Sequence, residues 1–185
     1  LAKVREPATK LRLETVLIGA RGLSTVTGTA GLQLNGVQSP DHALDVVLIP
    51  GFMHTSAEDV IHKLADYKPE IELIRALHLR GIPIAAACCG SFLLAEAGLL
   101  DGHEATTSWW LDATFRNRYP NVKLNVEKMI VEDGRFTTTG ASTAVLSYVL
   151  QLLAKHVDES LAQVTGKMML IDTERSSQAP YISMV

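Results

Sequence analysis

The chain has 185 residues, a net charge of -3 and 47% apolar residues, the composition of an ordinary soluble domain with a substantial core. Its 17 basic residues are scattered among 20 acidic ones, so we expect no nucleic-acid contact from these residues themselves. The only cysteines, Cys88 and Cys89, are neighbours, which excludes a disulfide framework and fits a reducing compartment. No apolar run approaches the ~18 residues of a membrane span and no segment resembles a signal peptide, so we expect a cytoplasmic protein.

The first half of the chain predicts short strands followed by helices. We expect strands at 14–18, 24–27 and 44–50. The last of these is a continuous apolar run that ends at Pro50-Gly51, as is typical of a buried parallel strand. Ser56 is expected to cap one helix, and a second helix is expected from Pro69 to Gly81, with Ile71, Ile74 and Leu77 on one apolar stripe.

The second half continues the alternation of helices and strands. We expect a short helix from Trp109 to Asn117 and strands at 122–126, 129–131 and 135–139. The helix that follows Gly140 is apolar nearly all round, so it is expected to be buried. Asp158 begins a last helix, and from Ile171 onward the pattern dissolves into what we interpret as a linker. This alternation predicts an α/β fold with a parallel sheet covered on both faces.

The segment from Ile82 to Leu100 carries the clearest functional signal. It is an apolar strand, a sharp turn with Cys88 at its tip, and a helix that opens on small residues. This is the form of a nucleophile elbow, whose side chain projects above the sheet. The helix N-terminus beneath the cysteine favours its thiolate form.

Several motifs carry a resemblance to a known family. They are Leu48-Ile49-Pro50-Gly51, Ala87-Cys88-x-Gly90, Gly98-Leu99-Leu100-Asp101-Gly102, Ala105-Thr106-Thr107, and Asp133-Gly134-Arg135-Phe136 with Gly140-Ala141 after it. The stretch from Leu44 to Leu170 resembles the class I glutamine amidotransferase-like fold of the PfpI/ThiJ superfamily, and within it the N-terminal domain of AraC-family transcriptional regulators. The resemblance implies a flavodoxin-like three-layer sandwich with a mostly parallel sheet.

The resemblance also implies a domain organisation. Residues 1–170 would form the sensor domain, with the family's first strand missing, and residues 171–185 would be a linker toward a C-terminal helix-turn-helix domain absent from this chain. The partners implied are a small-molecule effector, DNA through the C-terminal domain, and a second copy of the chain in a homodimer.

The same resemblance argues against catalysis. Hydrolytic relatives often carry histidine directly after the elbow cysteine or just after the Thr-Thr pair, where this chain has Cys89 and Ser108. The acidic partner of many relatives falls in the missing segment. A nucleophile needs a base to take its proton, so we expect Cys88 to be inactive and the domain not to be an enzyme.

A ligand pocket is expected beside the elbow. The resemblance places the backbone N–H groups of Gly51 and Cys89 where relatives form an oxyanion-type hole, and places Ser108 and Trp109 at the rim. Tryptophan can hold a cation, so an amino-acid-like or quaternary-amine effector is expected. The expected ligand-binding residues are Gly51, Phe52, His54, Cys88, Cys89, Ser108, Trp109 and Gly140. No histidine pair has the spacing of a metal site, and no metal or cofactor is expected.

Two alternatives stay open. One is a PfpI/ThiJ-type cysteine hydrolase or glyoxalase-like enzyme, which would need a base near Cys88. The other is a thiol redox sensor that uses Cys88 and Cys89, although a disulfide between sequence neighbours closes a small strained ring.

Overall fold

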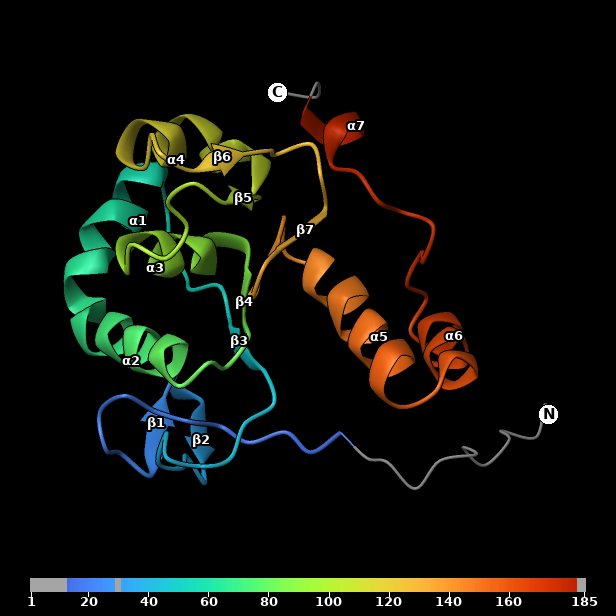
Figure 1. Cartoon of the computed structure of the whole chain (residues 1–185), viewed down its shortest axis with the longest axis horizontal. Helices are drawn as coiled ribbons and strands as arrows, with labels where there is room; N and C mark the ends of the chain where they lie inside the picture. Colours follow the sequence, from blue (N-terminus) through green and yellow to red (C-terminus); the bar gives the residue numbers. More distant parts are fainter. Residues whose placement is uncertain (1–12, 29–30, 183–185) are drawn as a thin grey trace.

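The computed structural model describes residues 13–28 and 31–182. A central sheet has the strand order β3 (Val47–Ile49), β4 (Ile84–Ala87), β8 (Phe136–Thr139) and β7 (Ile130–Asp133). β3, β4 and β8 run parallel, whereas β7 pairs antiparallel with β8. Helices cover both faces, with α1 to α3 on one side and α5 and α6 on the other (Figure 1). The predicted three-layer α/β sandwich with a mostly parallel sheet is confirmed.

The helices on the first face include those predicted after Ser56, near Pro69 and after the elbow. They are α1 (Ala57–Lys63), η2 (Leu64–Tyr67), α2 (Lys68–Leu79) and α3 (Ser91–Glu96). The Ser56 side chain accepts a hydrogen bond from the Asp59 N–H and so caps α1, as expected. After α2 the chain turns at Gly81, whose φ of 82° is readily adopted by glycine alone.

The remaining elements follow the elbow in the chain. They are β5 (Glu104–Ala105), η4 (Trp109–Leu111), α4 (Asp112–Arg118), β6 (Lys123–Leu124), α5 (Ala144–His156), α6 (Glu159–Met168) and α7 (Ala179–Ile182). β5 and β6 pair parallel in a small sheet of their own. None of the helices in the described ranges is long and apolar enough to cross a membrane.

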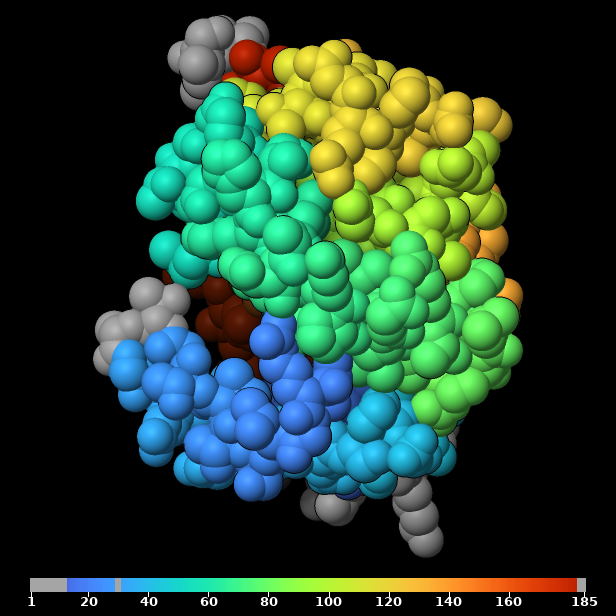
Figure 2. Space-filling model, turned by 90° about the vertical axis from the view of Figure 1, so that its left-hand side faces the viewer, coloured from blue at the N-terminus to red at the C-terminus, as the bar shows by residue number. Residues whose placement is uncertain are grey.

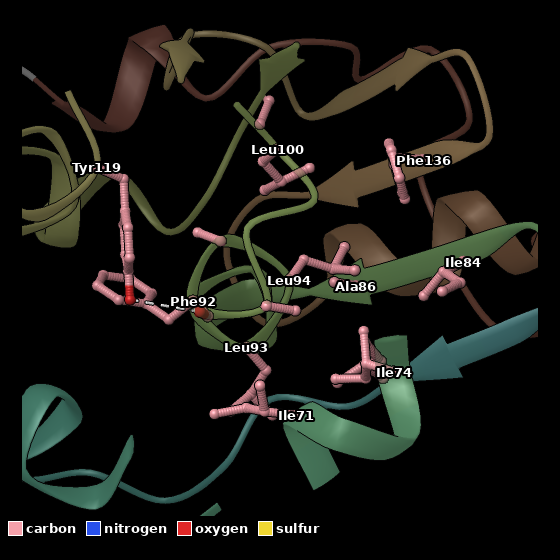
Figure 3. Close-up of a cluster of buried hydrophobic side chains, with 14 of the residues drawn as sticks. Ile71, Ile74, Ile84, Ala86, Phe92, Leu93, Leu94, Leu100, Tyr119 and Phe136 are labelled. Atoms are coloured by element: carbon pink, nitrogen blue, oxygen red, sulfur yellow. Dashed lines mark hydrogen bonds between the residues drawn. The ribbon is translucent and has the colours of Figure 1, made fainter. Parts of the chain in front are cut away.

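The main core lies between the sheet and the α1–α3 layer. Phe92 on α3 is fully buried and packs edge-to-face on Phe115 at 4.8 Å and on Tyr119 at 5.9 Å between ring centroids. Figure 3 shows Ile71 and Ile74 of α2 in the same cluster, below Leu93 and Leu94 of α3. These residues occupy the apolar stripe predicted for α2. The core therefore fixes α3, and with it the elbow that precedes α3.

Three expectations about elements are wrong. The helix that Asp158 begins is not the last one, because α7 follows it within the segment interpreted as a linker. Residues 14–18 form no strand; Ile18 makes only an isolated bridge to Gln38. α5 is buried on one face alone, and Val149 on the opposite face is 39% exposed. Apolar composition predicted burial, but a helix in an outer layer has one side against the sheet and another side turned outward, whatever its sequence.

The N-terminal part of the described chain lies outside the central sheet. β1 (Thr25–Thr27) and β2 (Gln33–Asn35) form an antiparallel pair, of which the first was predicted. Figure 2 shows this pair in blue below α1 and α2, with a hollow between it and α1. The expected lack of the family's first strand concerns residues 1–12, which are outside the described residues.

The segment after α6 makes specific contacts with the rest of the domain. Met129 N–H donates to the Ser176 carbonyl at 3.1 Å, and Gln178 N–H donates to the Glu127 carbonyl at 2.7 Å. Lys128 and Ser177 form an antiparallel bridge. The predicted boundary near residue 170 stays a prediction, but residues 176–178 are held along the 127–129 segment.

Candidate functional site

Cys88 stands at the tip of a sharp turn, as the elbow pattern predicts. The chain passes from β4 into a short 3-10 turn, η3 (Cys88–Gly90), and then into α3. Cys88 has a φ of 54°, one of two positive values among the described non-glycine residues. Such a conformation costs about 1–3 kcal/mol and persists only where the surroundings impose it.

Hydrogen bonds to the Cys88 carbonyl and the close packing of Gly90 against the end of β3 impose this backbone conformation on Cys88. The Ser91 hydroxyl donates to the Cys88 carbonyl at 2.9 Å, and the Thr107 hydroxyl donates to the same oxygen at 3.2 Å. Gly90 faces the end of β3, where a Cβ would lie 2.7 Å from the Pro50 carbonyl oxygen. Glycine is therefore required two residues after Cys88 for the elbow to pack against the neighbouring strand end.

The Cys88 sulfur is set up as a thiolate. Its Sγ lies 2.7 Å from the Ser108 Oγ. Hydrogen bonds from the Cys89 side chain, from Ser108 and from the Cys89 N–H stabilise the Cys88 thiolate, and His54 adds a favourable electrostatic effect. Together these effects outweigh burial, which acts in the opposite direction, and lower the pKa of Cys88 to about 6. At neutral pH Cys88 is consequently anionic for most of the time.

Cys89 has the opposite character. It is fully buried, and its sulfur accepts from the Phe52 N–H at 3.2 Å. Its single S–H has two acceptors within reach, the Phe52 carbonyl at 3.3 Å and the Cys88 sulfur. The hydrogen bond to Cys88 and burial both raise the pKa of Cys89 far above its usual range. Of the two cysteines, Cys88 ionises near neutral pH, whereas Cys89 stays protonated and can donate a hydrogen bond.

The strand ends bring most of the predicted site residues together. Gly51 follows β3, and a Cβ there would lie 3.3 Å from the Cys88 Cβ, so any side chain at this position would crowd the elbow. His54 is half-buried, and its Nδ1 lies 3.1 Å from the Phe52 carbonyl oxygen. Phe52, Cys89 and Ser108 contact one another or Cys88 directly, as described above. Gly51, Phe52, His54, Cys88, Cys89 and Ser108 therefore form one group, which we call the elbow group.

Trp109 and Gly140 lie beside a neighbouring feature. A cavity of about 250 Å³ is lined by Trp109, Met129, Ala141, Thr143, Ala144, Arg175, Ser177, Gln178 and Tyr181. Trp109 is half-buried and meets the exposed Trp110 edge-to-face at 5.3 Å. Gly140 directly precedes the lining residue Ala141. Cys88 is not among the lining residues, so we name this space the tryptophan cavity and keep it separate from the elbow group.

Gln178 was missed by the sequence reasoning, which interpreted it as part of a linker. It is 4% exposed, and its Oε1 accepts from the Ala141 N–H at 2.8 Å. Its Nε2 faces four oxygens at 3.0 to 3.4 Å, those of Val126 O, Thr107 O, Lys128 O and Thr106 Oγ1. A Cβ on Gly140 would lie 2.2 Å from the Gln178 amide carbon, so glycine gives this amide its space.

No sequence signal could have found this contact. The oxygens around Gln178 come from residues 50 to 72 positions earlier, and neither periodicity nor a turn rule relates them to it. Thr107 joins the two features, because its hydroxyl bonds the Cys88 carbonyl while its own carbonyl accepts from Gln178.

The chemistry available at the elbow is that of a reactive thiolate whose closest polar partner is a hydroxyl. A serine hydroxyl can stabilise the thiolate, but a neutral hydroxyl is too weakly basic to serve as a general base. Within the described residues no group of three or more His, Cys, Asp or Glu side chains is arranged to hold a metal ion.

Comparison with known proteins places this geometry in a family. The model of the DJ-1/PfpI family matches residues 8–155. The HTH-type transcriptional regulator GbdR of Pseudomonas aeruginosa is 27% identical over 111 residues, which are 60% of this chain and 30% of that protein. Isonitrile hydratase of Pseudomonas putida is 29% identical over 147 residues, 78% of this chain and 60% of that protein.

Solved structures agree on the fold. The crystal structure of an AraC family transcriptional regulator from Pseudomonas putida matches with a TM-score of 0.62 at 17% identity, over 82% of this chain and 78% of that chain. The part of this chain that matches the regulator GbdR spans less than a third of that regulator's own length. Because the family model covers most of the sequence, this chain belongs to the DJ-1/PfpI family.

Proposed function

We propose that this chain is the ligand-sensing and dimerisation domain of an AraC-type transcriptional regulator, acts in the cytoplasm and has no catalytic activity of its own. DNA would be bound by a C-terminal domain beyond these residues. Similarity to GbdR and to the AraC family structure supports the regulatory assignment. The observation that carries the non-catalytic part is that the closest polar partner of the Cys88 sulfur is the Ser108 hydroxyl: the thiolate forms without a base, but turnover also needs a group that moves protons to or from the reacting molecule, and a neutral hydroxyl is a poor one.

The effector in this proposal is an amino-acid-like molecule or a quaternary amine that presents its cation to the site. The Cys88 thiolate attracts a cation at neutral pH, since the pKa of Cys88 is about 6. Trp109 lines the neighbouring tryptophan cavity, and in this proposal the ligand lies between the tryptophan cavity and the elbow group, so that its cation also interacts with the Trp109 ring. The Cys89 N–H already interacts with the Cys88 sulfur, so a ligand carboxylate is less favoured there than the cationic end.

Calorimetric titration of the protein with betaine-type and amino-acid ligands tests this proposal. Trp109→Ala and Cys88→Ser should each weaken binding of a quaternary amine about tenfold, because each removes an attraction worth about 1–2 kcal/mol to a desolvated cation. Leu79→Ala is the control, since Leu79 is 86% exposed and does not line the tryptophan cavity. A confirmed ligand whose affinity is unchanged in both test variants would contradict the assignment of the site.

The second candidate function is a cysteine-dependent hydrolase or hydratase. Two observations favour it, the lowered pKa of Cys88 and the similarity to isonitrile hydratase. In this case His54, which lies close enough to act electrostatically on Cys88, would have to supply the base in its neutral form. The purified protein should be assayed with isonitrile, amide, ester and 2-oxoaldehyde substrates beside Cys88→Ala. Turnover that disappears in Cys88→Ala would establish the enzyme and overturn the first proposal.

A further inference from the structure

A second cavity lies away from the elbow group, on the side of the sheet covered by α5 and α6 (Figure 1). Its volume is about 430 Å³, within the range of small-molecule sites. α5, α6 and the segment 173–176 form its walls, together with the start of β7. The apolar part of the wall is made of Met129, Ile130, Leu150, Ala154 and Ala162. We call this space the helix cavity.

Unpaired polar atoms gather at the helix cavity. In the part of the chain that the structure describes, four buried side-chain atoms lack a hydrogen-bond partner: His78 Nδ1, Thr139 Oγ1, Ser147 Oγ and Arg175 Nε. Two of the four belong to residues that line this one cavity. A buried polar atom without a partner costs about 1–3 kcal/mol, so a ligand that pairs with both Ser147 and Arg175 would recover that cost.

The charges around the helix cavity define the ligand further. Arg175 uses its Nη2 to donate to the Thr143 hydroxyl at 2.9 Å, which leaves its Nε for another acceptor. Glu159 and Glu174 also line the cavity and are exposed to solvent. One positive and two negative side chains disfavour a simple anion. They suit a molecule that carries both a carboxylate and a protonated amine.

We propose that the helix cavity binds a small aliphatic amino acid as its zwitterion. The ligand carboxylate accepts hydrogen bonds from the Ser147 hydroxyl and the Arg175 Nε–H. The ligand ammonium donates to Glu159 or Glu174. The aliphatic side chain packs on Leu150 and its apolar neighbours.

The helix cavity adjoins the tryptophan cavity, with which it shares Met129 and Arg175, but Ser147 lines the helix cavity alone and the two spaces favour different cations. The lining of the helix cavity has no aromatic ring, whereas Trp109 stands at the other site. Carboxylate side chains bind a cation more strongly when the cation can donate hydrogen bonds to them. A free ammonium group is therefore preferred here over a quaternary amine.

Calorimetric titration with L-leucine, N-acetyl-L-leucine and L-leucinamide tests the ligand chemistry on the 185-residue protein. Acetylation removes the ammonium and amidation removes the carboxylate, while both keep the side chain. We expect L-leucine to bind about tenfold or more tightly than either derivative, since each derivative loses a charge-assisted hydrogen bond. Equal binding of all three compounds, or no binding of L-leucine at millimolar concentration, would overturn the proposal.

Variants test the location. Ser147→Ala and Arg175→Gln should each weaken L-leucine binding about tenfold. The melting temperature of unliganded Ser147→Ala should not fall, because the lost hydroxyl had no partner, and this outcome excludes misfolding as the cause of weaker binding. Ser160→Ala and Arg135→Gln are matched controls at exposed positions outside the cavity and should bind normally.

Two further outcomes separate this site from the proposed function. L-leucine binding that survives both Ser147→Ala and Arg175→Gln would refute the helix-cavity site. Trp109→Ala should leave L-leucine binding unchanged while it weakens the quaternary amine. Loss of L-leucine binding in Trp109→Ala would move the amino acid to the tryptophan cavity and refute the second site.

Discussion

Cys88 combines a left-handed backbone with a lowered thiol pKa, and both properties come from contacts made by the same few neighbours. Ser91 and Thr107 hold its carbonyl, while Ser108 and Cys89 hold its sulfur. Because the backbone is held rigidly, the sulfur stays within reach of its donors, and the anionic form is stabilised.

We predict that Cys88 is alkylated by iodoacetamide with a midpoint near pH 6. The pKa of Cys88 is lowered to about 6, so the reactive thiolate is present above that pH and is lost as the pH falls through it. Ser108→Ala should move the midpoint to higher pH, because it removes a hydrogen bond to the thiolate. Mass spectrometry across a pH series measures both effects. A midpoint near about 8.5, the value of free cysteine, would contradict the prediction.

Gln178 is the second residue whose buried, hydrogen-bonded surroundings give it a structural role. Its amide is buried and surrounded by backbone groups, and Gly140 leaves the room for it. The C-terminal segment is therefore attached to the rim of the sheet through one side chain, next to the peptide that carries Thr107 and Ser108.

We expect Gln178→Ala to lower the free energy of unfolding by about 1–3 kcal/mol, because it leaves the Ala141 N–H without its acceptor and the Val126 carbonyl without the amide donor. Gln33→Ala, at an exposed position on β2, is the matched control and should change stability by less than about 0.5 kcal/mol. Urea denaturation measures both. Equal stability of the two variants would show that the Gln178 amide is not a structural anchor.

At the scale of elements, short-range signals place the N-termini of two helices correctly, whereas α5 begins at Ala144 and not directly after Gly140. Ser56 caps α1 and Asp158 caps α6, each through its side chain. In contrast, the sequence of α5 does not reveal how much of the helix is buried. The burial of each face depends on whether another layer of the fold packs against it.

The cap of α6 gives a test at this scale. The Leu161 N–H donates to the Asp158 carboxylate at 2.8 Å. Asp158→Ala should cost about 1 kcal/mol, which corresponds to a fall of about 2–4 °C in melting temperature for a domain of this size. Asp158→Asn should retain most of the stability, because asparagine also caps well. Asp45→Ala, at an exposed position with no cap, is the control, and an equal loss in it would contradict the role of the cap.

At the scale of the whole molecule, charge and size suggest a division of labour. The net charge is -3, and the basic residues are scattered. Non-specific DNA affinity arises from neutralised phosphates and needs clustered Lys and Arg. The regulator in our proposal therefore binds DNA with residues beyond this chain, and this domain supplies sensing and a two-fold dimer.

We predict that residues 1–185 alone do not shift DNA in a low-salt gel, whereas a protein extended by a helix-turn-helix domain does. Sedimentation should show a dimer of the 185-residue chain. Sequence-specific DNA binding by the isolated domain would contradict this division of labour, and a strictly monomeric domain would remove its dimerising role.

The sequence alone determined the layer architecture, the elbow at Cys88 and the convergence of the Gly51, Cys88 and Gly140 strand ends. These features depend on local rules, namely apolar runs, helix caps and turn residues, together with the parallel order that alternation implies. The absence of a strand at 14–18 could not be read in this way, because a β-branched apolar run forms a strand only where a partner strand is available.

Only the tertiary structure decided the electrostatics and the cavities. The pKa of Cys88 depends in part on Ser108, 20 positions away. The Gln178 amide depends on groups as far back as Thr106, and the two cavities are enclosed by elements distant in sequence. Such properties arise from desolvation and from groups brought together by folding, so no pattern of neighbouring residues encodes them.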